Sequence, residues 1–331
     1  MEITLAQAIG KGIAEEMRRN PDVFIMGENV SRTGSIYRVL AGLLDEFGEE
    51  RVKDTPLAEE IIINTAIGAA MKGLRPVAEI MYVDFLDLGM NALICQAAKC
   101  WFNSGGKINV PLVIRCPQGA ESGRGSQHTN SYESLFANIP GLKVVLPATP
   151  YDAKGLIKAA IRAEDPVIFL EHKALYYTKG EVPEENYIIP LGKADVKREG
   201  KDISIITYSK PVLDALEVAE QLEEEGISVE VVDVRTLMPL DIDTILNSVK
   251  KTKRAIVLYE APVYYGAGAE ITTQIQEALF DVLEAPVKRI GGKFTHIAYA
   301  ANLAKAAIPG VDDIKKAVKE VIKYNKYKRE D

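Results

Sequence analysis

Residues 203–259 read ISIITYSKPVLDALEVAEQLEEEGISVEVVDVRTLMPLDIDTILNSVKKTKRAIVLY, and this stretch decides the fold class. Short runs rich in Val and Ile alternate in it with helical patterns, in the order 203–208, 211–225, 229–234, 242–250 and 255–259. Such alternation is typical of a parallel sheet, because each connection between parallel strands has to cross over, usually as a helix. Gly226 follows the first helical pattern as a suitable C-terminal stop. The stretch therefore predicts an α/β domain.

The preceding part of the chain alternates in the same way. Its expected strands are residues 23–26, 77–81, 111–115, 143–146 and 167–171. Thr4 followed by Gln7 is a capping-box pattern that opens a first helix. Further helices are expected through Gln96 and Lys99 and over 152–164. This half is also predicted to be a parallel α/β domain.

The length of 331 residues predicts two domains, since single cores stop growing at roughly 250–300 residues. A stretch rich in Pro, Glu and Lys separates the two alternating parts and is interpreted as a linker with one β-hairpin. The predicted boundaries are 1–180 for the first domain, 181–201 for the linker and 202–331 for a smaller second domain.

The composition excludes several classes of partner. With 47% hydrophobic and 26% charged residues the chain is typical of globular proteins, and its net charge of −7 offers no basic surface for nucleic acid or anionic membrane. The start MEITLAQAIGKGIAEEMRRN lacks the apolar run of a signal peptide. Cys95, Cys100 and Cys116 are no disulfide framework and fit a reducing cytosol, with the first two expected in the core. We predict a cytoplasmic protein.

Common cofactor and nucleophile motifs are absent from the sequence. Gly266-Ala-Gly268 lacks the third glycine of a dinucleotide fingerprint, and Gly123-Arg-Gly125 does not follow a strand at the required spacing. There is no phosphate-binding GxxxxGK[ST] loop, no zinc-like spacing of Cys and His, and no G-x-S-x-G elbow. Three histidines also argue against a multi-histidine metal site.

Three candidate site residues lie near the expected carboxyl ends of strands, where open α/β sheets bind ligands. Glu59 follows Thr55-Pro56 and is expected to be at the start of a helix. It either takes part in the reaction or only stabilises the helix by placing a negative charge at its N-terminus. Phe85 lies in the aromatic segment Tyr82-Val-Asp-Phe85, which by itself reads as core. His128 lies in a glycine-rich loop and is either a proton carrier or a surface residue.

These segments together resemble the beta subunit of the thiamine-diphosphate-dependent first component of 2-oxoacid dehydrogenase complexes, of the pyruvate, acetoin or branched-chain type, in the transketolase-like superfamily. The resemblance covers nearly the whole chain. The matching runs are GENV at 27–30, RVKDTPLAE at 51–59, AIGAAMKGLRPVAEI at 66–80, QAAK at 96–99, SGG at 104–106, QHTNS at 127–131, PGLKVVLPATPYDAKGLIKAAI at 140–161, DPVIFLEHKALY at 165–176, PLGKADVKREGKD at 190–202, VVDVRTLMPLDIDTI at 231–245 and APVKRIGG at 285–292.

The resemblance implies a role for each candidate residue. Glu59 matches the glutamate that hydrogen-bonds the cofactor's aminopyrimidine and promotes loss of the thiazolium proton, a role suited to a carboxyl group of raised pKa. Phe85 matches the aromatic that packs on the aminopyrimidine, and Glu28 is expected in the same pocket. His128 matches a histidine that moves protons during acyl transfer to a lipoyl group. The implied fold is a pyrimidine-binding domain followed by a transketolase C-terminal-like domain.

The resemblance also implies partners and ions. The chain contains no GDG motif, so the Mg²⁺ that holds the diphosphate is expected on an alpha subunit, with the cofactor shared in a two-alpha, two-beta heterotetramer. A beta–beta contact through the second domain and a lipoyl acyltransferase core are further expected partners. The family's potassium site, where present, uses backbone carbonyls at positions that match Leu112, Ala160, Ile161, Ala163 and Asp165.

Several positions depart from the family pattern. HSQ is common in the family where this chain has His128-Thr-Asn, Asp-Gln where it has Asn91-Ala92, and a Pro-x-Pro segment and a glutamate where it has His296, Ala298 and Ala304. LYYTKGEVPEE at 175–185 looks most similar to acetoin-type subunits, with pyruvate second and branched-chain 2-oxoacids third. Alternative interpretations are a split transketolase C-terminal half and an assembly subunit without catalytic duty.

Overall fold

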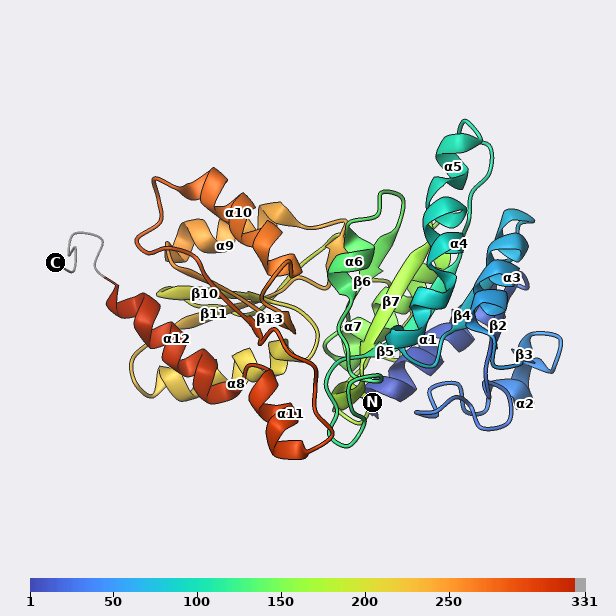
Figure 1. Ribbon diagram of the computed structural model, residues 1–331, viewed down its shortest axis with the longest axis horizontal. Coiled ribbons are helices and arrows are strands. Elements are labelled where there is room, and N and C mark those ends of the chain that lie inside the picture. Colours follow the sequence, from blue (N-terminus) through green and yellow to red (C-terminus); the bar gives the residue numbers. More distant parts are fainter. Residues whose placement is uncertain (325–331) are drawn as a thin grey trace. The chain divides into compact units, whose positions relative to one another are not determined.

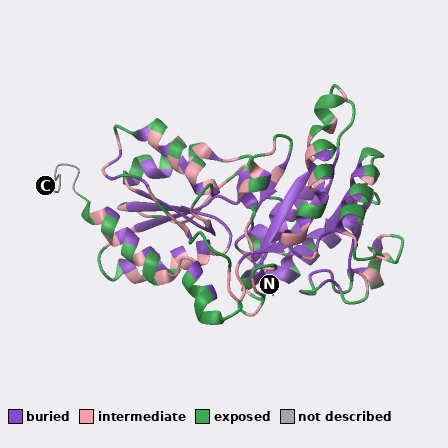
Figure 2. Cartoon of the chain, in the orientation of Figure 1, coloured by how far each residue is buried: buried purple, intermediate pink, exposed green. Residues whose placement is uncertain are grey.

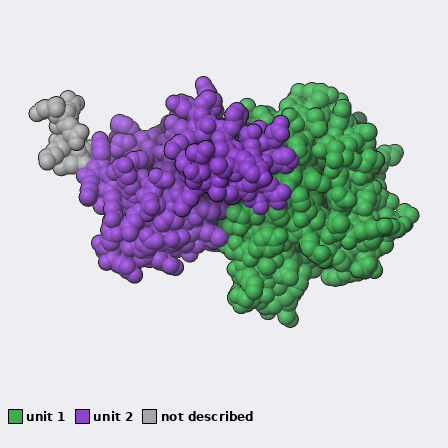
Figure 3. Space-filling view, turned by 60° about the horizontal axis from the view of Figure 1, so that its bottom comes forward, with its two compact units in different colours: residues 1–118, 135–191, 237–239 green, residues 119–134, 192–236, 240–331 purple. Residues whose placement is uncertain are grey.

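The computed structural model describes residues 1–324, and the chain divides into two compact units (Figure 1; Figure 3). Unit 1 consists of residues 1–118, 135–191 and 237–239. Unit 2 consists of residues 119–134, 192–236 and the chain from 240 onward. The segment 119–134 thus leaves unit 1 after a strand and belongs to unit 2.

The core of unit 1 is a seven-stranded sheet. Its strands, in spatial order, are β12 (Thr236–Met238), β6 (Lys143–Val145), β7 (Val167–His172), β5 (Val113–Gln118), β4 (Arg75–Glu79), β2 (Val23–Gly27) and β3 (Val52–Asp54). All pairs from β6 to β3 are parallel. Every residue of the central strands β5 and β7 is buried, as Figure 2 shows, which is typical of a parallel sheet covered on both faces. The parallel α/β prediction for this half is confirmed.

Helices and short 3₁₀ turns connect these strands. They are α1 (Leu5–Arg19), α2 (Leu43–Phe47), α3 (Glu59–Met71), η1 (Val83–Gly89), α4 (Met90–Cys95), η2 (Ala97–Lys99), α5 (Cys100–Asn103), α6 (Glu133–Ala137), α7 (Pro150–Arg162) and η3 (Lys173–Leu175). The capping box predicted at Thr4 is present, because the Gln7 amide donates to Thr4 Oγ1 at 3.2 Å and the Thr4 amide to Gln7 Oε1 at 3.0 Å. A small antiparallel pair joins β1 (Glu2–Thr4) to β8 (Lys179–Glu181).

Unit 2 is built on a five-stranded sheet. The order is β14 (Lys288–Gly292), β13 (Ala255–Pro262), β10 (Ile203–Thr207), β11 (Val229–Asp233) and β9 (Asp195–Arg198), of which only β9 is antiparallel among the described strands. The helices are α8 (Pro211–Glu223), α9 (Ile242–Thr252), α10 (Ala267–Leu279), α11 (Ala301–Ala307) and α12 (Val311–Lys323). In Figure 1, α9 and α10 cover one face of the sheet and α8 and α12 the other.

The glycines that resembled an incomplete dinucleotide motif have a packing role in unit 2. The ring of Tyr259 in β13 lies against Gly266, Gly268 and Gly291. A Cβ atom on Gly268 would lie 2.0 Å from the Tyr259 ring, and one on Gly266 would lie 2.4 Å from it. These positions therefore need glycine so that the backbone can approach an aromatic side chain.

Some expectations about local structure were wrong. The helix expected through Gln96 and Lys99 is broken into α4, η2 and α5, and Cys95 is exposed and Cys100 half-buried, whereas both were expected in the core. Ala92, Leu93 and Ala97 of this segment are buried, but Cys95 lies on the exposed side of α4, and α5 projects from unit 1 (Figure 1). The helix after Pro211 ends at Glu223 rather than Glu225. The glycine stop expected at Gly226 is confirmed, because Gly226 has a left-handed φ of +80° and the Ile227 amide donates to the Leu222 carbonyl at 3.0 Å.

The hairpin expected within residues 181–201 is also absent. The strands of this part of the chain, β8 and β9, pair with β1 and β11 in two different sheets rather than with each other. Several described elements had no counterpart in the sequence-based prediction, among them α2, β3, α6, β12, α10, β14, α11 and α12. Among residues 1–324, no helix combines the length and the apolar character that crossing a membrane requires.

Candidate active site

Polar side chains collect at the carboxyl ends of the parallel strands of unit 1. Glu28 follows β2, Thr55 follows β3 and Gln118 is the last residue of β5. Glu59 is the first residue of α3, as predicted. Because the carboxyl ends of parallel strands meet at one edge of a sheet, these residues share the edge where open α/β sheets bind ligands.

Glu28 and Glu59 form a buried pair of like charges. Only 7% of Glu28 and 6% of Glu59 is exposed. Burial raises the pKa of Glu28, and the nearby charge of Glu59 raises it further. Glu28 therefore holds a proton more readily than an ordinary glutamate, and a carboxyl group of raised pKa suits proton exchange with a bound group.

Three buried polar atoms at this edge lack a hydrogen-bond partner within residues 1–324. They are Glu28 Oε1, Thr55 Oγ1 and Gln118 Oε1. Buried polar atoms are paired in nearly all folded proteins, so orphaned ones mark places that a polar ligand or water satisfies. A ligand that presents ring nitrogens and an amino group fits donors and acceptors of this kind.

The segment after Glu28 is held by local hydrogen bonds. Asn29 adopts the left-handed φ of 52°, and its carbonyl accepts from the Ser35 amide at 2.9 Å. The Ser31 amide donates to Asp54 Oδ1 at 2.8 Å, which ties the segment to the end of β3. Neighbouring strand ends thus fix the backbone that carries Glu28.

Phe85 lies in η1, which packs against α3. The side chain of Ile63 in α3 would contact any Cβ atom on Gly89 of η1, so the two elements approach closely. Phe85 is half-buried and meets the ring of Tyr82 edge-to-face, with ring centroids 5.9 Å apart. The structure therefore places Phe85 on the element next to the helix that begins with Glu59.

Sequence reasoning missed a buried charge cluster beneath this edge. Arg115 in β5 pairs with Glu79 at the end of β4 and with Glu171 in β7. The Arg115 Nε atom donates to Glu171 Oε1 at 2.7 Å, and the Tyr176 hydroxyl donates to Glu171 Oε2 at 2.6 Å. Each of the three charged side chains is at most 3% exposed. In the sequence, the only sign of this cluster was Arg115, a charged residue within an otherwise apolar strand pattern.

The cluster holds two carboxyl groups around one guanidinium. Burial raises the pKa of Glu79 to about 7, with the charges of Glu171 and Glu28 adding to the rise and Arg115 opposing it. Glu171 makes the two-pronged pair with Arg115, so charge balance in the buried cluster is met when Glu79 is neutral. Through Glu79 the cluster is electrostatically linked to Glu28.

His128 belongs to unit 2, whereas Glu28, Glu59 and Phe85 belong to unit 1. It lies in the loop 119–134 between β5 and α6, and is half-buried. The Thr129 hydroxyl donates to the Gly125 carbonyl at 2.7 Å, and the Asn130 side-chain amide donates to the Ser126 carbonyl at 3.0 Å. Thr129 and Asn130, which depart from the family pattern, thus stabilise the turn on either side of His128.

Four of the five backbone carbonyls expected at a potassium site accept hydrogen bonds in this structure. The guanidinium of Arg75 donates to the carbonyls of Ile161 at 2.9 Å and Ala163 at 3.1 Å. The carbonyls of Leu112 and Ala160 accept from the amides of Val167 and Ala163. The positively charged Arg75 side chain already donates hydrogen bonds to two of the five carbonyls. This arrangement does not fit a potassium ion unless Arg75 moves, because the two positive charges would repel each other.

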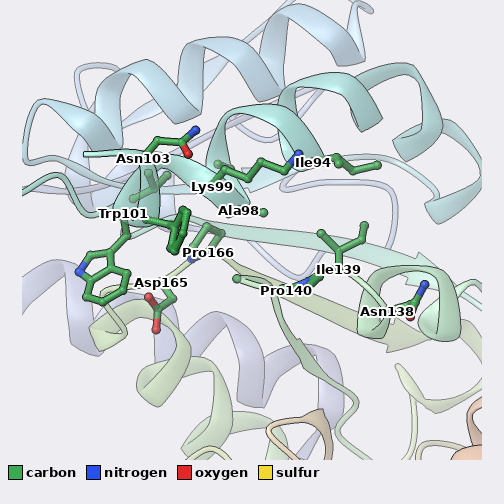
Figure 4. Close-up of a pocket in the computed structure, with 14 residues that line it drawn as sticks. Ile94, Ala98, Lys99, Trp101, Asn103, Asn138, Ile139, Pro140, Asp165 and Pro166 are labelled. Atoms are coloured by element: carbon green, nitrogen blue, oxygen red, sulfur yellow. The ribbon is translucent and has the colours of Figure 1, made fainter. Parts of the chain in front are cut away.

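Unit 1 also contains an apolar cavity that none of the side chains Glu28, Glu59 and Phe85 lines. Its volume is about 700 Å³, and its walls include Ile94, Trp101, Pro140 and Pro166. Figure 4 shows Trp101 and Asp165 at one end of this cavity and Asn138 at the other. Its position beside α4 and α5 sets it apart from the strand ends that carry the two glutamates.

Comparison with known proteins identifies the family. Residues 1–179 match the family model "Transketolase, pyrimidine binding domain", and residues 192–314 match "Transketolase, C-terminal domain". The chain is 46% identical to the 2-oxoisovalerate dehydrogenase subunit beta of Bacillus subtilis, over 96% of this chain and 98% of that protein. The chain belongs to the beta subunits of the 2-oxoacid dehydrogenases. The family predicted from the sequence is thereby confirmed.

Further relatives of this beta subunit carry names that refer to pyruvate. It is 43% identical to the pyruvate dehydrogenase E1 component subunit beta of Staphylococcus aureus, over 98% of this chain and 99% of that one. A solved structure described as a split gene transketolase, inactive beta4 tetramer, matches with a TM-score of 0.79 at 21% identity, over 98% of this chain and 99% of the other. This likeness confirms the predicted fold, a pyrimidine-binding domain followed by a transketolase C-terminal-like domain.

Proposed function

We propose that this beta subunit activates thiamine diphosphate for oxidative decarboxylation of a 2-oxoacid, with Glu59 as the activating residue. The observation that carries the proposal is the buried Glu28–Glu59 pair at the carboxyl edge of the sheet. Burial and the neighbouring carboxylate raise the pKa of Glu28, and such a shift favours a carboxyl group that takes part in proton exchange.

The residues at the strand ends suit an aminopyrimidine. Thiamine diphosphate supplies a nucleophilic carbon once its thiazolium ring loses a proton. Glu59 would hold a proton at a ring nitrogen, and the raised pKa of Glu28 would help to keep that proton on the carboxyl pair. Phe85, on the neighbouring element, would support the ring by packing. The orphaned oxygen atoms of Glu28, Thr55 and Gln118 offer partners for the cofactor or for ordered water.

The activity is proposed to require an alpha subunit that holds Mg²⁺ and the diphosphate. Residues 1–331 contain no GDG motif, and the described part of the chain contains no cluster of His, Cys, Asp and Glu that could hold a metal. We therefore infer a two-alpha, two-beta heterotetramer that delivers its acyl group to a lipoyl acyltransferase core, with a beta–beta contact through unit 2. The departures at His296 and Ala304 fall in unit 2; His296 is exposed and would alter a partner surface, whereas Ala304 is buried.

The substrate is proposed to be a 2-oxoacid because relatives at 43% and 46% identity carry the names pyruvate and 2-oxoisovalerate dehydrogenase. Residues 175–185 rank the substrates in the order acetoin, pyruvate and branched-chain 2-oxoacid, and this order stays a prediction. The cytoplasmic location also stays a prediction. Turnover of the three substrates by the reconstituted complex decides the order.

Bound potassium likewise stays a prediction. Because the Arg75 guanidinium donates to two of the required carbonyls, we infer that this side chain supplies the positive charge there and that potassium is dispensable. A thermal melt in KCl that exceeds the melt in NaCl by several degrees would contradict this inference.

Calorimetry tests whether binding of thiamine diphosphate requires the alpha subunit. The purified chain is titrated with thiamine diphosphate and Mg²⁺, alone and after mixing with an alpha subunit from the same family. We expect negligible heat from the chain alone and saturable binding by the mixture. Tight stoichiometric binding by the chain alone would overturn the need for a partner.

A further inference from the structure

The loop that carries His128 is closed on itself. We call residues 119–134 the His128 loop. At its mouth the Gly119 amide donates to the Asn130 carbonyl at 3.0 Å, and inside it the side chains of Thr129 and Asn130 bind backbone carbonyls. These bonds shape the loop, but they do not attach it to the rest of unit 2.

Glu260 provides an attachment at both ends of the His128 loop. Its Oε1 atom accepts from the Ala120 amide at 2.6 Å and from the Ser131 hydroxyl at 3.4 Å. Ala120 lies near the start of the loop and Ser131 lies three residues after His128. One carboxylate oxygen therefore ties the entry of the loop to the segment that follows the histidine.

The position of Glu260 makes it a rigid anchor. It belongs to β13, which is hydrogen-bonded to β14 on one side and β10 on the other. Its side chain is 9% exposed. Burying a carboxylate costs free energy unless it is well hydrogen-bonded, and a carboxylate that accepts from a backbone amide forms a stronger bond than a neutral acceptor.

Two further attachments hold other parts of the loop. The Tyr208 hydroxyl, just after β10, donates to Glu133 Oε1 at 2.9 Å at the end of the loop. The Gly123 amide donates to the Tyr299 carbonyl at 3.3 Å near its tip. Of these contacts, the one from Glu260 to Ser131 lies nearest to His128 along the chain.

We propose that Glu260 is a positioning residue for His128, which it serves by fixing the loop in one place for proton transfer to the lipoyl acceptor. The inference rests on the role proposed for His128. Its physical basis is that a misplacement of about 1 Å can cost roughly 10²-fold in rate, so a proton carrier on a loop needs a fixed support.

The test compares Glu260→Ala and Glu260→Gln with a matched control in the alpha–beta complex. The control is Glu270→Ala, an exposed residue of the neighbouring helix α10 that contacts Gln274. We expect Glu260→Ala to lower lipoyl-dependent turnover roughly 10-fold to 10²-fold with little change in KM for the 2-oxoacid. Turnover with an artificial electron acceptor, which bypasses the lipoyl step, should fall much less. Glu260→Gln keeps an acceptor oxygen and should restore part of the loss.

Two further readouts separate positioning from a general structural role. Trypsin cleavage after Arg124, within the loop, should be faster in Glu260→Ala than in the Glu270→Ala control, while the melting temperatures of the two agree. The double variant His128→Ala/Glu260→Ala should be no slower than His128→Ala alone, because Glu260 acts through the histidine.

The outcomes also separate this inference from the proposed function. If His128→Ala loses lipoyl transfer and Glu260→Ala does not, the role of His128 stands and the positioning role is wrong. If His128→Ala keeps full transfer, the role of His128 fails and the inference fails with it. An additive double variant would likewise overturn the positioning role.

Discussion

The edge that carries Glu59 and the loop that carries His128 are held in different ways. Glu28 directly follows strand β2, which is paired with β3 and β4, and Glu59 is the first residue of helix α3. His128 stands in a loop of unit 2 that depends on side-chain contacts from Glu260 and Tyr208. Regular secondary structure therefore positions the two glutamates, whereas a few side-chain hydrogen bonds position His128.

The difference indicates where each site is vulnerable. The glutamate edge rests on a buried cluster of charges, so a single substitution beneath it affects the folding of unit 1. The His128 loop is held by side chains, so we expect a substitution of one of them to shift the loop without disrupting the sheets of unit 2. Stability measurements should therefore report on the first region and rate measurements on the second.

The largest effect is expected at Arg115. Arg115→Met leaves Glu171 buried without its cation, which costs roughly 3–5 kcal/mol of unfolding free energy when one partner of a buried pair is removed. The control is Arg18→Met, which removes an exposed pair with Glu46 and should cost less than about 1 kcal/mol. Urea denaturation of both variants measures the difference. Equal losses of unfolding free energy in the two variants would show that the Arg115 cluster does not stabilise the edge that carries Glu28 and Glu59.

The next effect is on catalysis by Glu59. Glu59→Gln keeps the size of the side chain but cannot exchange a proton, so activation of the cofactor should fall at least about 10²-fold in the alpha–beta complex. Glu60→Gln, on the exposed side of the same helical turn, is the matched control. Exchange of the thiazolium proton, followed by NMR, is the measurement. Near-normal exchange in Glu59→Gln would favour a subunit with only an assembly role.

His128 should affect one half of the reaction more than the other. His128→Ala is expected to lower lipoyl-dependent turnover by about 10²-fold, at the low end for a general acid or base, and to leave turnover with an artificial acceptor largely intact. Gln127→Ala, exposed in the same loop, is the control. An equal loss in both assays would place His128 earlier, in substrate binding.

The smallest effect is a pH dependence from Glu79. Its ordinary pKa is 4.5 and burial raises it to about 7 in the folded chain, so between these values the folded state holds a proton that the unfolded state lacks. Stability should therefore fall as pH rises through this window, by at most about 1.4 kcal/mol per pH unit. Glu79→Gln should remove this slope. Glu46→Gln should not, because the hydrogen bond from Arg18 lowers the pKa of Glu46.

The sequence predicted most strands and several helices because their patterns are local. The buried runs at 203–208 and 229–234 and the capping box at Thr4 required no tertiary context. Short elements such as β3 and α5 failed because three or four residues carry too little periodicity. Cys95 was misplaced for a related reason, since an apolar neighbourhood in sequence does not show which elements project from a sheet.

The sequence by itself determined the family, the alternation of strands and helices, and the candidates Glu28, Glu59, Phe85 and His128, because these depend on ordered motifs along the chain. Only the tertiary structure decided that Glu59 lies within electrostatic range of Glu28, that Arg115 joins Glu79 and Glu171, and that Glu260 reaches both ends of the His128 loop. Those partners are far apart in sequence, and it is the pairing of strands that brings their side chains within hydrogen-bonding or electrostatic range.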